Sequence, residues 1–300
     1  MDGTQQPAIF GEVLYDVFDD EHTVLGGAPF NVAWHLQGFG LSPSFISRIG
    51  RDAHGENIIK TMQAWGMNQD GIQFDKEHAT GTVSVSITKG QPSYDIVADV
   101  AYDHLKPVAV EQLMHTDKLP ILYHGSLIAR TKQTHDVLSA LREKAASIFV
   151  DINLRDPWWD HELIFSLIEG ATWLKVNDEE LALLMSIDNH FIGLENAAIN
   201  LLSRYALEGI IVTRGEQGAL FVSTNGVFHA KPVMVSNIQD TVGAGDAYSA
   251  VCMIGFMNNW DYQLMLDRAA IFAGAICQQR GATSSNIALY EEYIKQWKLG

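Results

Sequence analysis

Residues 240–246 read Asp-Thr-Val-Gly-Ala-Gly-Asp, and the stretch that follows, residues 247–257, is apolar and compatible with a helix. A helix that begins directly after a glycine-rich turn presents backbone N–H groups at its N-terminus, and these groups bind anions. Asp246 supplies a carboxylate at the same place. The combination favours phosphoryl transfer, because the amides and the helix dipole stabilise phosphate charge while Asp246 accepts the proton of an attacking hydroxyl. From these residues alone, an Asp that merely caps the helix is the alternative.

Short β-branched or apolar runs alternate along the chain with amphipathic stretches. The pattern predicts strands at residues 8–13, 44–49, 119–123, 147–151, 172–176, 209–213 and 219–223. It predicts helices at residues 30–38, 56–64, 133–144, 163–169, 179–185 and 194–205. This alternation indicates an α/β fold with a mainly parallel sheet flanked by helices on both faces. In such a fold, ligands bind at the carboxyl ends of the strands.

Residues 81–100 depart from this pattern. Apolar and polar side chains alternate there around a Lys-Gly-Gln-Pro turn at residues 89–92, which predicts an exposed antiparallel hairpin. Residues 13–25 are expected to add a strand or two beside it. We therefore expect a small β lid, made of two separate segments, over the mouth of a site. Since no repeat, low-complexity tract or linker is evident, residues 1–300 are expected to form one domain that carries this lid.

The composition favours a cytoplasmic enzyme. The chain has 36 acidic against 20 basic residues, a net charge of −16 and 47% hydrophobic residues. Such a chain repels polyanions, so that nucleic acid and anionic membranes are not expected as partners. Residues 1–10 lack the pattern of a signal peptide. Cys252 and Cys277 lie in apolar helical patterns and are expected to be reduced thiols.

A second signature reads Gly-Gly-Ala-Pro-Phe-Asn-Val-Ala at residues 26–33, and Gly-Phe-Gly at 38–40 and Ile-Gly-Arg-Asp-Ala-His-Gly at 49–55 continue it. With residues 240–246, it makes the chain resemble the ribokinase/PfkB family of carbohydrate kinases, in its fructokinase-like branch, from about residue 11 to 285. The resemblance implies a ribokinase-like fold and transfer of phosphate from ATP, with Mg²⁺, to a primary hydroxyl of a small sugar. D-Fructose is the expected sugar, and ribose, 2-keto-3-deoxygluconate and nucleosides are the alternatives. The catalytic residues that it implies are Gly243, Ala244, Gly245 and Asp246.

The resemblance also implies a sugar site. Its expected residues are Asp16, Gly26, Gly27, Asn31 and Arg155. Paired glycines let the backbone approach a ligand closely, Asn31 offers a donor and an acceptor, and Arg155 can bind oxygens through two N–H groups. A glycine-rich turn before a packed helix, and a solvated acid at Asp16 followed by Asp19, Asp20 and Glu21, are the alternatives. Ile152 replaces a proline that is common in the family.

The nucleotide and ion sites follow from the same resemblance. Asn177 and Glu180 are expected to hold Mg²⁺ through water, although an acidic first helical turn explains them equally well. Thr213, Gly215 and Gly218 are expected near the phosphates and the ribose, and residues 270–279 near the adenine. The chain has no P-loop motif. A site for a monovalent cation such as K⁺ is implied at Asp240, Val242, Gly281 and Ser285, with a capping role for Asp240 as the alternative.

Several features leave other interpretations open. Arg51 and His54 replace residues that are more often acidic and aromatic in the family. Because no histidine falls in a spaced metal pattern, His35, His104 and His124 are expected to be structural. A sugar-binding regulatory protein without turnover is the alternative of another class, whereas a dinucleotide-dependent oxidoreductase would need a Gly-x-Gly-x-x-Gly motif that is absent after the first strand. The lid is expected to pair two chains into a homodimer.

Overall fold

A computed structural model describes residues 6–18, 22–88, 91–107, 119–187 and 191–299. The chain divides into two compact units. The first unit comprises residues 1–120, 128–145 and 284–300, and the second comprises residues 121–127 and 146–283. The first unit is thus assembled from three separate stretches of the chain, whereas most of the second is continuous.

The second unit is built on a mainly parallel sheet. Its strand order is β13-β12-β11-β10-β9-β8. The strands are β8 (Leu122–His124), β9 (Ile148–Asp151), β10 (Trp173–Asn177), β11 (Gly209–Thr213), β12 (Ala219–Ser223) and β13 (Gly226–Ala230). Strands β8 to β11 run parallel, and β12 and β13 continue the sheet in antiparallel fashion. The carboxyl ends of the parallel strands therefore meet at one edge.

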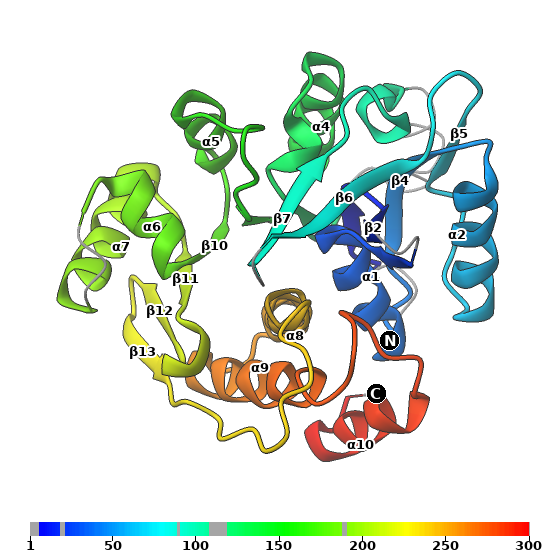
Figure 1. Cartoon of the computed structure of the whole chain (residues 1–300). Coiled ribbons are helices and arrows are strands. Elements are labelled where there is room, and N and C mark those ends of the chain that lie inside the picture. Colours follow the sequence, from blue (N-terminus) through cyan, green and yellow to red (C-terminus); the bar gives the residue numbers. More distant parts are fainter. Residues whose placement is uncertain (1–5, 19–21, 89–90, 108–118, 188–190, 300) are drawn as a thin grey trace. The chain divides into compact units, whose positions relative to one another are not determined.

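Helices cover both faces of this sheet. They are α5 (His161–Ile168), α6 (Asp178–Met185), α7 (Phe191–Tyr205), α8 (Ala244–Met257) and α9 (Tyr262–Ile276). Figure 1 shows α7 and α9 on opposite sides of the strands β11 and β12. Every residue of β12 is buried, as expected for a strand that is packed on both faces. The prediction of a mainly parallel sheet between two helical layers is confirmed for this unit.

The first unit contains a second run of parallel strands, in the order β1-β4-β5. They are β1 (Ala8–Phe10), β4 (Ser44–Gly50) and β5 (Ile72–Asp75). Its helices are α1 (Ala28–Gly38), α2 (Ala53–Ala64), α4 (Lys132–Lys144) and α10 (Ile287–Trp297). The end of the chain is fixed to α1 by two buried hydrogen bonds: Trp34 Nε1 donates to Ser284 O at 2.8 Å, and His35 Nδ1 lies 2.9 Å from Tyr290 Oη.

A separate four-stranded sheet of the first unit has the order β3-β2-β6-β7, and we call it the small sheet. It consists of β2 (Leu14–Phe18), β3 (Thr23–Gly26), β6 (Gly81–Thr88) and β7 (Gln91–Ile96). Strands β6 and β7 form the predicted antiparallel hairpin, and β2 joins β6 in parallel. Part of the predicted turn, residues 89–90, and the acidic residues 19–21 lie outside the described residues.

Several predicted elements differ from those in the structure. The predicted strand at residues 119–123 is only a bridge at Leu119 followed by β8, and the strand predicted at 8–13 ends at Phe10. Strands β5 and β13 and helix α10 were not predicted. Strands β5 and β13 have only four and five residues, too few for a clear alternation of apolar and polar side chains. Helix α10 has an amphipathic pattern that the sequence analysis overlooked.

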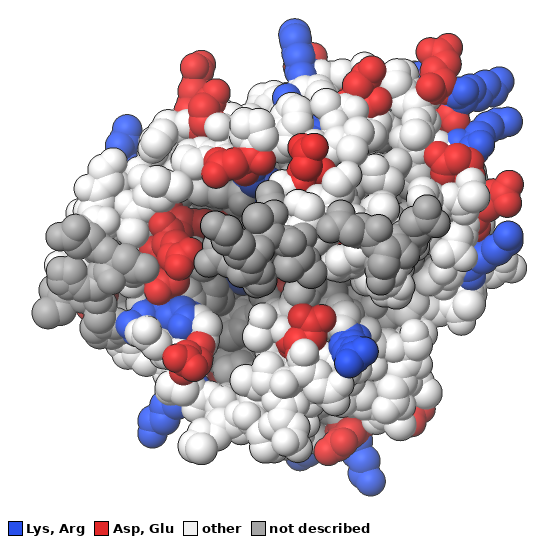
Figure 2. All heavy atoms as spheres, viewed as in Figure 1, with Lys and Arg blue, Asp and Glu red and all other residues white. Residues whose placement is uncertain are grey.

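Two observations concern the surface and the helices. On the face drawn in Figure 2, Lys and Arg side chains lie among the Asp and Glu side chains. Among the described helices, none has both the length and the apolar character needed to span a bilayer.

Asp52 connects α2 with the start of the hairpin. It caps α2 by accepting from Gly55 N at 2.8 Å, and its second oxygen accepts from Thr80 N at 2.7 Å. Burial by itself would raise the pKa of Asp52, but the hydrogen bonds from Thr80 and Gly55 outweigh burial and lower it. Because the folded-state pKa is depressed, this stabilisation is present above the ordinary aspartate pKa and is lost as the pH falls through the folded value.

Asp52→Ala should therefore lower the free energy of unfolding at neutral pH by about 1–2 kcal/mol, the upper range for loss of a helix cap. The deficit should shrink below about pH 4. Urea unfolding at a series of pH values measures both effects. Asp160→Ala is the matched control, since exposed Asp160 caps α5 through Leu163 N at 2.8 Å and should cost less. Equal losses in the two variants would contradict the second role of Asp52.

Candidate active site

Helix α8 begins at the glycine-rich turn. Gly243 is its N-cap residue, with a left-handed φ of 78° and no capping side chain. A Cβ atom at Gly243 would lie 2.4 Å from Ala282 Cα, so that only glycine allows the chain at residue 282 to pack against the turn. Gly243 is required here both by its backbone conformation and by this close approach.

The start of α8 differs from that of most described helices. Aspartates cap α2, α5 and α9, Thr131 caps α4 and Asn177 caps α6. Helices α1, α8 and α10 have no capping side chain, and of these only α1 and α8 begin at a glycine with positive φ. These two are the helices of the two sequence signatures. In α8 the Ala244 amide donates to Thr241 O at 3.3 Å, and the other amides of the first turn are the groups that a helix start can offer to an anion.

Asp246 lies in the first turn of α8 and is partly exposed. The core begins at the next residue, Ala247, which is fully buried. The carboxylate of Asp246 is therefore not packed into the core. The negative charge of Asp246 contributes to the raised pKa of Lys175.

A buried ion pair lies under the turn. Lys175 Nζ, on β10, is 3.0 and 2.8 Å from the two carboxylate oxygens of Asp151, at the end of β9. Ser249 Oγ, on α8, donates to Asp151 Oδ2 at 2.7 Å, and Tyr123 Oη donates to the same oxygen at 3.0 Å. A Cβ atom on Gly245 would be 3.6 Å from Lys175 Nζ. The pair thus joins the first turns of α8 to two strands.

Lys175 stays charged in this buried position. Burial lowers its pKa, but attraction by Asp151, with smaller contributions from Glu180 and Asp246, raises the pKa above its ordinary value. Our sequence analysis missed both members of the pair. The available signal was a lysine in the middle of an apolar strand, because a buried lysine requires a partner. The amide of Ile152 donates to Lys175 O at 3.1 Å, a bond that a proline at 152 could not make.

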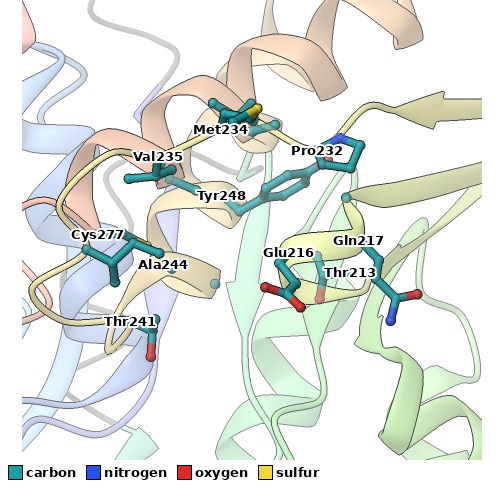
Figure 3. Close-up of a pocket in the computed structure, with 18 of the residues that line it drawn as sticks. Thr213, Glu216, Gln217, Pro232, Met234, Val235, Thr241, Ala244, Tyr248 and Cys277 are labelled. Carbon is teal, nitrogen blue, oxygen red and sulfur yellow. The ribbon is translucent and has the colours of Figure 1, made fainter.

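A cavity of about 990 Å³ opens beside the turn. One wall comes from the loop after β11 and includes Thr213, Gly215 and Gly218, which are three residues predicted at the nucleotide site. The floor includes Thr241, Ala244 and Gly245 of the glycine-rich segment. The turn and the predicted nucleotide loop therefore line the same cavity (Figure 3). Asp246 does not occur among the described residues that line it.

The opposite wall is apolar. It consists of residues 232–235 and of one face of α9, including Ala270, Ala273 and Gly274. A Cβ atom on Gly274 would lie 3.0 Å from Val235 Cγ2, so that glycine permits this segment to approach the helix. Met234 is 99% exposed, and Tyr248 points toward Pro232 across the cavity (Figure 3). Tyr248 Oη is buried and has no hydrogen-bond partner among the described residues.

Asn177 and Glu180 form a capping box at the start of α6. Asn177 Oδ1 accepts from Glu180 N at 2.8 Å, and Glu180 Oε2 accepts from Asn177 N at 2.8 Å. Glu180 Oε1 also accepts from Leu154 N at 2.8 Å. Burial raises the pKa of Glu180, against the opposing effect of the Asn177 amide. Both side chains therefore have a structural role, and each oxygen keeps a lone pair for water.

Asp240 also accepts from backbone amides. Its Oδ1 accepts from Val242 N and its Oδ2 from Gly281 N, each at 3.0 Å. Three residues predicted at a monovalent cation site are thus brought together. Ser285, the fourth, belongs to the other unit.

The predicted sugar-binding residues are divided between the two units. Asp16, Gly26, Gly27 and Asn31 belong to the first unit, and Arg155 to the second. Within the first unit, a Cβ atom on Gly26 would lie 3.7 Å from Asp16 Oδ2, which puts that carboxylate beside the segment that leads into α1. Asn31 is 4% exposed, and Arg155 is exposed.

Comparison with known proteins identifies the family of the chain. The profile of the pfkB family carbohydrate kinases matches residues 9–289 of the chain. The chain belongs to this family. As a pfkB-family kinase, it is a phosphotransferase that acts on a sugar hydroxyl. It is 28% identical to fructokinase-2 of Oryza sativa subsp. japonica over 96% of this chain and 93% of the rice protein.

Solved structures resemble this pfkB-family kinase over almost its whole length. A sugar kinase of Pyrococcus horikoshii, described as uncharacterized and solved in complex with ATP, has a TM-score of 0.75 at 25% identity, covering 92% of this chain and 93% of that one. Fructokinase from Vibrio cholerae, solved with fructose, ADP and calcium ion, has a TM-score of 0.82 at 23% identity, covering 97% and 99%. The predicted ribokinase-like fold is confirmed.

Lys175→Met should lower the free energy of unfolding by about 3–5 kcal/mol, because it leaves the Asp151 carboxylate buried without its cation. The Asp151→Leu/Lys175→Met double variant should recover much of this loss. Lys132→Met is the control: Lys132 Nζ lies 2.8 Å from Asp136 with 87% of its side chain exposed, and its removal should change stability by about 0.5 kcal/mol or less. Urea unfolding measures all three. If Lys175→Met were as stable as the wild type, the ion pair would not be what joins α8 to strands β9 and β10.

Proposed function

We propose that the protein transfers the γ-phosphoryl group of ATP to a primary hydroxyl of a small sugar, and that the sugar is D-fructose. The proposed chemistry rests on one observation. The glycine-rich start of α8, which has no capping side chain, lines a cavity and holds Asp246 in its first turn. The names of relatives support the sugar, since fructokinase-2 of rice matches nearly the whole chain. Their identity of at most 28% is the reason that the sugar is a proposal.

The cavity in the second unit fits ATP. Its volume, about 990 Å³, lies in the range of small-molecule sites, and its lining combines an apolar wall with a polar loop. We assign the adenine to the apolar wall of residues 232–235 and α9, and the ribose and phosphates to Thr213, Gly215 and Gly218. Tyr248 Oη, buried among these residues and without a hydrogen-bond partner in the described part of the chain, is positioned to bond the nucleotide or its water.

Charge on the transferred group would be met by the amides of residues 243–246. These are the amides of a first helical turn, and the helix dipole adds to their effect. Gly243 sets the turn and Ala282 packs against it, so that the donors are held before the reaction rather than arranged during it. Lys175 lies beneath Gly245 and adds a fixed positive charge, although Asp151 neutralises much of it.

Asp246 would accept the proton of the attacking hydroxyl. Partial exposure and a place at the positive end of the α8 dipole both favour its ionised form. An ionised carboxylate within hydrogen-bond reach of an alcohol is the requirement for a general base.

Mg²⁺ would neutralise charge on the ATP phosphates when it is bound. The oxygens of Asn177 and Glu180 fit a role through water, because each already accepts a backbone amide and retains a lone pair. A monovalent cation, K⁺ in our proposal, would act at the segment that Asp240 fastens to Val242 and Gly281, with Ser285 as a further ligand.

Sugar recognition is assigned to Asp16, Gly26, Gly27, Asn31 and Arg155. The carboxylate of Asp16 lies beside the uncapped start of α1, so that hydroxyl donors and acceptors could both be bound there. We propose that the small sheet is the lid of this site. We further propose that its edge strands, β3 and β7, pair two chains in a homodimer.

Asp246→Asn should lower kcat by about 10²–10⁴-fold while the dissociation constant of the sugar stays nearly unchanged, because the substitution removes the base and keeps the shape. Stopped-time ADP assays and calorimetric sugar titration measure the two quantities. Asp136→Asn is the control, since it makes the same charge change on exposed α4 and should leave kcat at the wild-type level. Wild-type turnover by Asp246→Asn would exclude this residue as the base.

The substrate is identified by an ADP-release assay over fructose, ribose, 2-keto-3-deoxygluconate, glucose and adenosine, each with and without K⁺. We expect fructose to give the highest kcat/KM. A higher value for another acceptor would exclude fructose as the preferred sugar and keep the kinase activity. Sugar binding without ADP release from any acceptor would instead favour a regulatory protein.

A further inference from the structure

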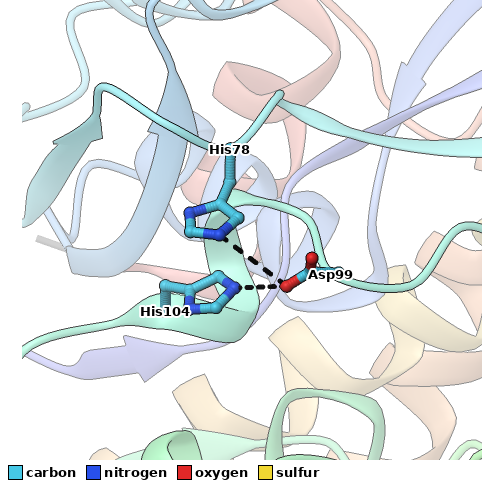
Figure 4. A group of neighbouring side chains, drawn as sticks. All are labelled: His78, Asp99 and His104. Atoms are coloured by element: carbon cyan, nitrogen blue, oxygen red, sulfur yellow. Dashed lines mark hydrogen bonds and ion pairs between the residues drawn. The ribbon is translucent and has the colours of Figure 1, made fainter.

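Three side chains with metal-binding atoms meet at the base of the small sheet. His78 precedes β6, Asp99 follows β7, and His104 is the last residue of a short 3-10 helix, Ala101–His104. One ligand atom from each lies within 4.8 Å of the others. Figure 4 shows both imidazole rings directed at the Asp99 carboxylate. The spacing of these residues in the sequence gave no metal pattern, and His104 was expected to be structural.

Both rings present Nε2 to the same oxygen. His104 Nε2 lies 2.7 Å from Asp99 Oδ1, and His78 Nε2 lies 3.7 Å from it. The rings are stacked, with centroids 3.5 Å apart and planes 14° apart. The stack brings both imidazoles to the same carboxylate, where a single ion could contact one ligand atom of each of the three residues.

A second carboxylate lies close to His78. Asp75 Oδ1 is 3.2 Å from His78 Nδ1, but this nitrogen makes no hydrogen bond among the described residues. Asp75 is itself held in place by Arg48 Nε, which donates to its Oδ2 at 2.6 Å, and by the amides of Glu77 and His78, which donate to its Oδ1 at 2.8 and 3.0 Å. The other ring nitrogen, His78 Nε2, is the one that faces Asp99.

His78 Nε2 and Asp99 Oδ1 are 3.7 Å apart, which is too far for a hydrogen bond. A metal ion bound by both atoms would occupy the space between them. Carboxylates beside metal-binding histidines recur in zinc sites. Asp99, with 78% of its side chain exposed, leaves space for a water molecule as a further ligand.

We propose that His78 Nε2, His104 Nε2 and the Asp99 carboxylate bind one divalent transition-metal ion of the Zn²⁺ class. Two imidazoles and one carboxylate suit Zn²⁺, whereas Mg²⁺ and Ca²⁺ prefer oxygen ligands. Zinc ligands lie about 2.0–2.2 Å from the ion, so that binding moves Asp99 slightly away from His104 and toward an equal distance from both rings. This site is separate from the ATP cavity, which belongs to the other unit.

The position of the site gives it a structural effect. His78 and Asp99 flank the two ends of the β6–β7 hairpin, and His104 lies on the segment that follows. A bound ion would therefore join the entry and exit of the hairpin. It would restrain the small sheet through residues that have no part in the proposed kinase chemistry.

Calorimetric titration of chelator-treated full-length protein with Zn²⁺ tests the proposal. We expect one ion per chain, and Co²⁺ in place of Zn²⁺ should give a visible absorption band of a nitrogen- and oxygen-ligated site. Because the loss of an outer-shell partner alone weakens metal binding about 10–100-fold, His104→Ala should weaken it at least about 100-fold. His161→Ala, which removes an exposed histidine of the other unit, should bind Zn²⁺ as the wild type does.

Asp99→Asn provides a second test that does not depend on folding, since its side chain is largely exposed. Circular dichroism confirms that each variant is folded before titration. The proposal is overturned if the wild type binds no Zn²⁺, or if folded His104→Ala and Asp99→Asn both retain wild-type affinity. Loss of the Co²⁺ band in both variants, with the band kept in His161→Ala, would establish the site.

Discussion

The contact between Lys175 and Asp151 is the constraint on which the arrangement of the second unit depends. It connects the ends of two parallel strands, and through Ser249 it fixes the first turns of α8 against them. The free energy lost by desolvating a buried ion pair can exceed the free energy gained from the attraction between its charges. We therefore assign this pair a role in positioning α8 rather than in raising net stability. The hydrogen bond from Ser249 to Asp151 thus fixes the orientation of the helix that follows the glycine-rich turn.

The helix starts fall into two kinds. Asp, Thr or Asn side chains cap the first-turn amides of α2, α4 and α6. Gly27 and Gly243, both with positive φ, occupy the cap positions of α1 and α8, the helices to which we assign ligand binding in our proposal. The reciprocal bonds of Asn177 and Glu180 shape the start of α6, and our proposal adds to them a role toward Mg²⁺ through water.

Much of the fold followed from the sequence because its signals are local. Strands β11 and β12 were predicted with their observed ends, since each is an apolar run bounded by turn residues. The two glycine signatures identified α1 and α8 and the family. The pairing of Asp151 with Lys175 could not be predicted, because it depends on which strands become neighbours. The meeting of His78, Asp99 and His104 likewise depends on how the hairpin folds back, which no spacing rule contains.

Two hydrogen bonds described for the first unit bear on how the protein is made. Trp34 and His35, near the beginning of the chain, reach Ser284 and Tyr290, near its end. During synthesis on the ribosome, the second unit can complete its sheet while the first still lacks α10. The buried face of α1 and its aromatic side chains must therefore stay partly uncovered until residues 284–290 have been translated, and the interval before this is a period of exposure to chaperones and to aggregation.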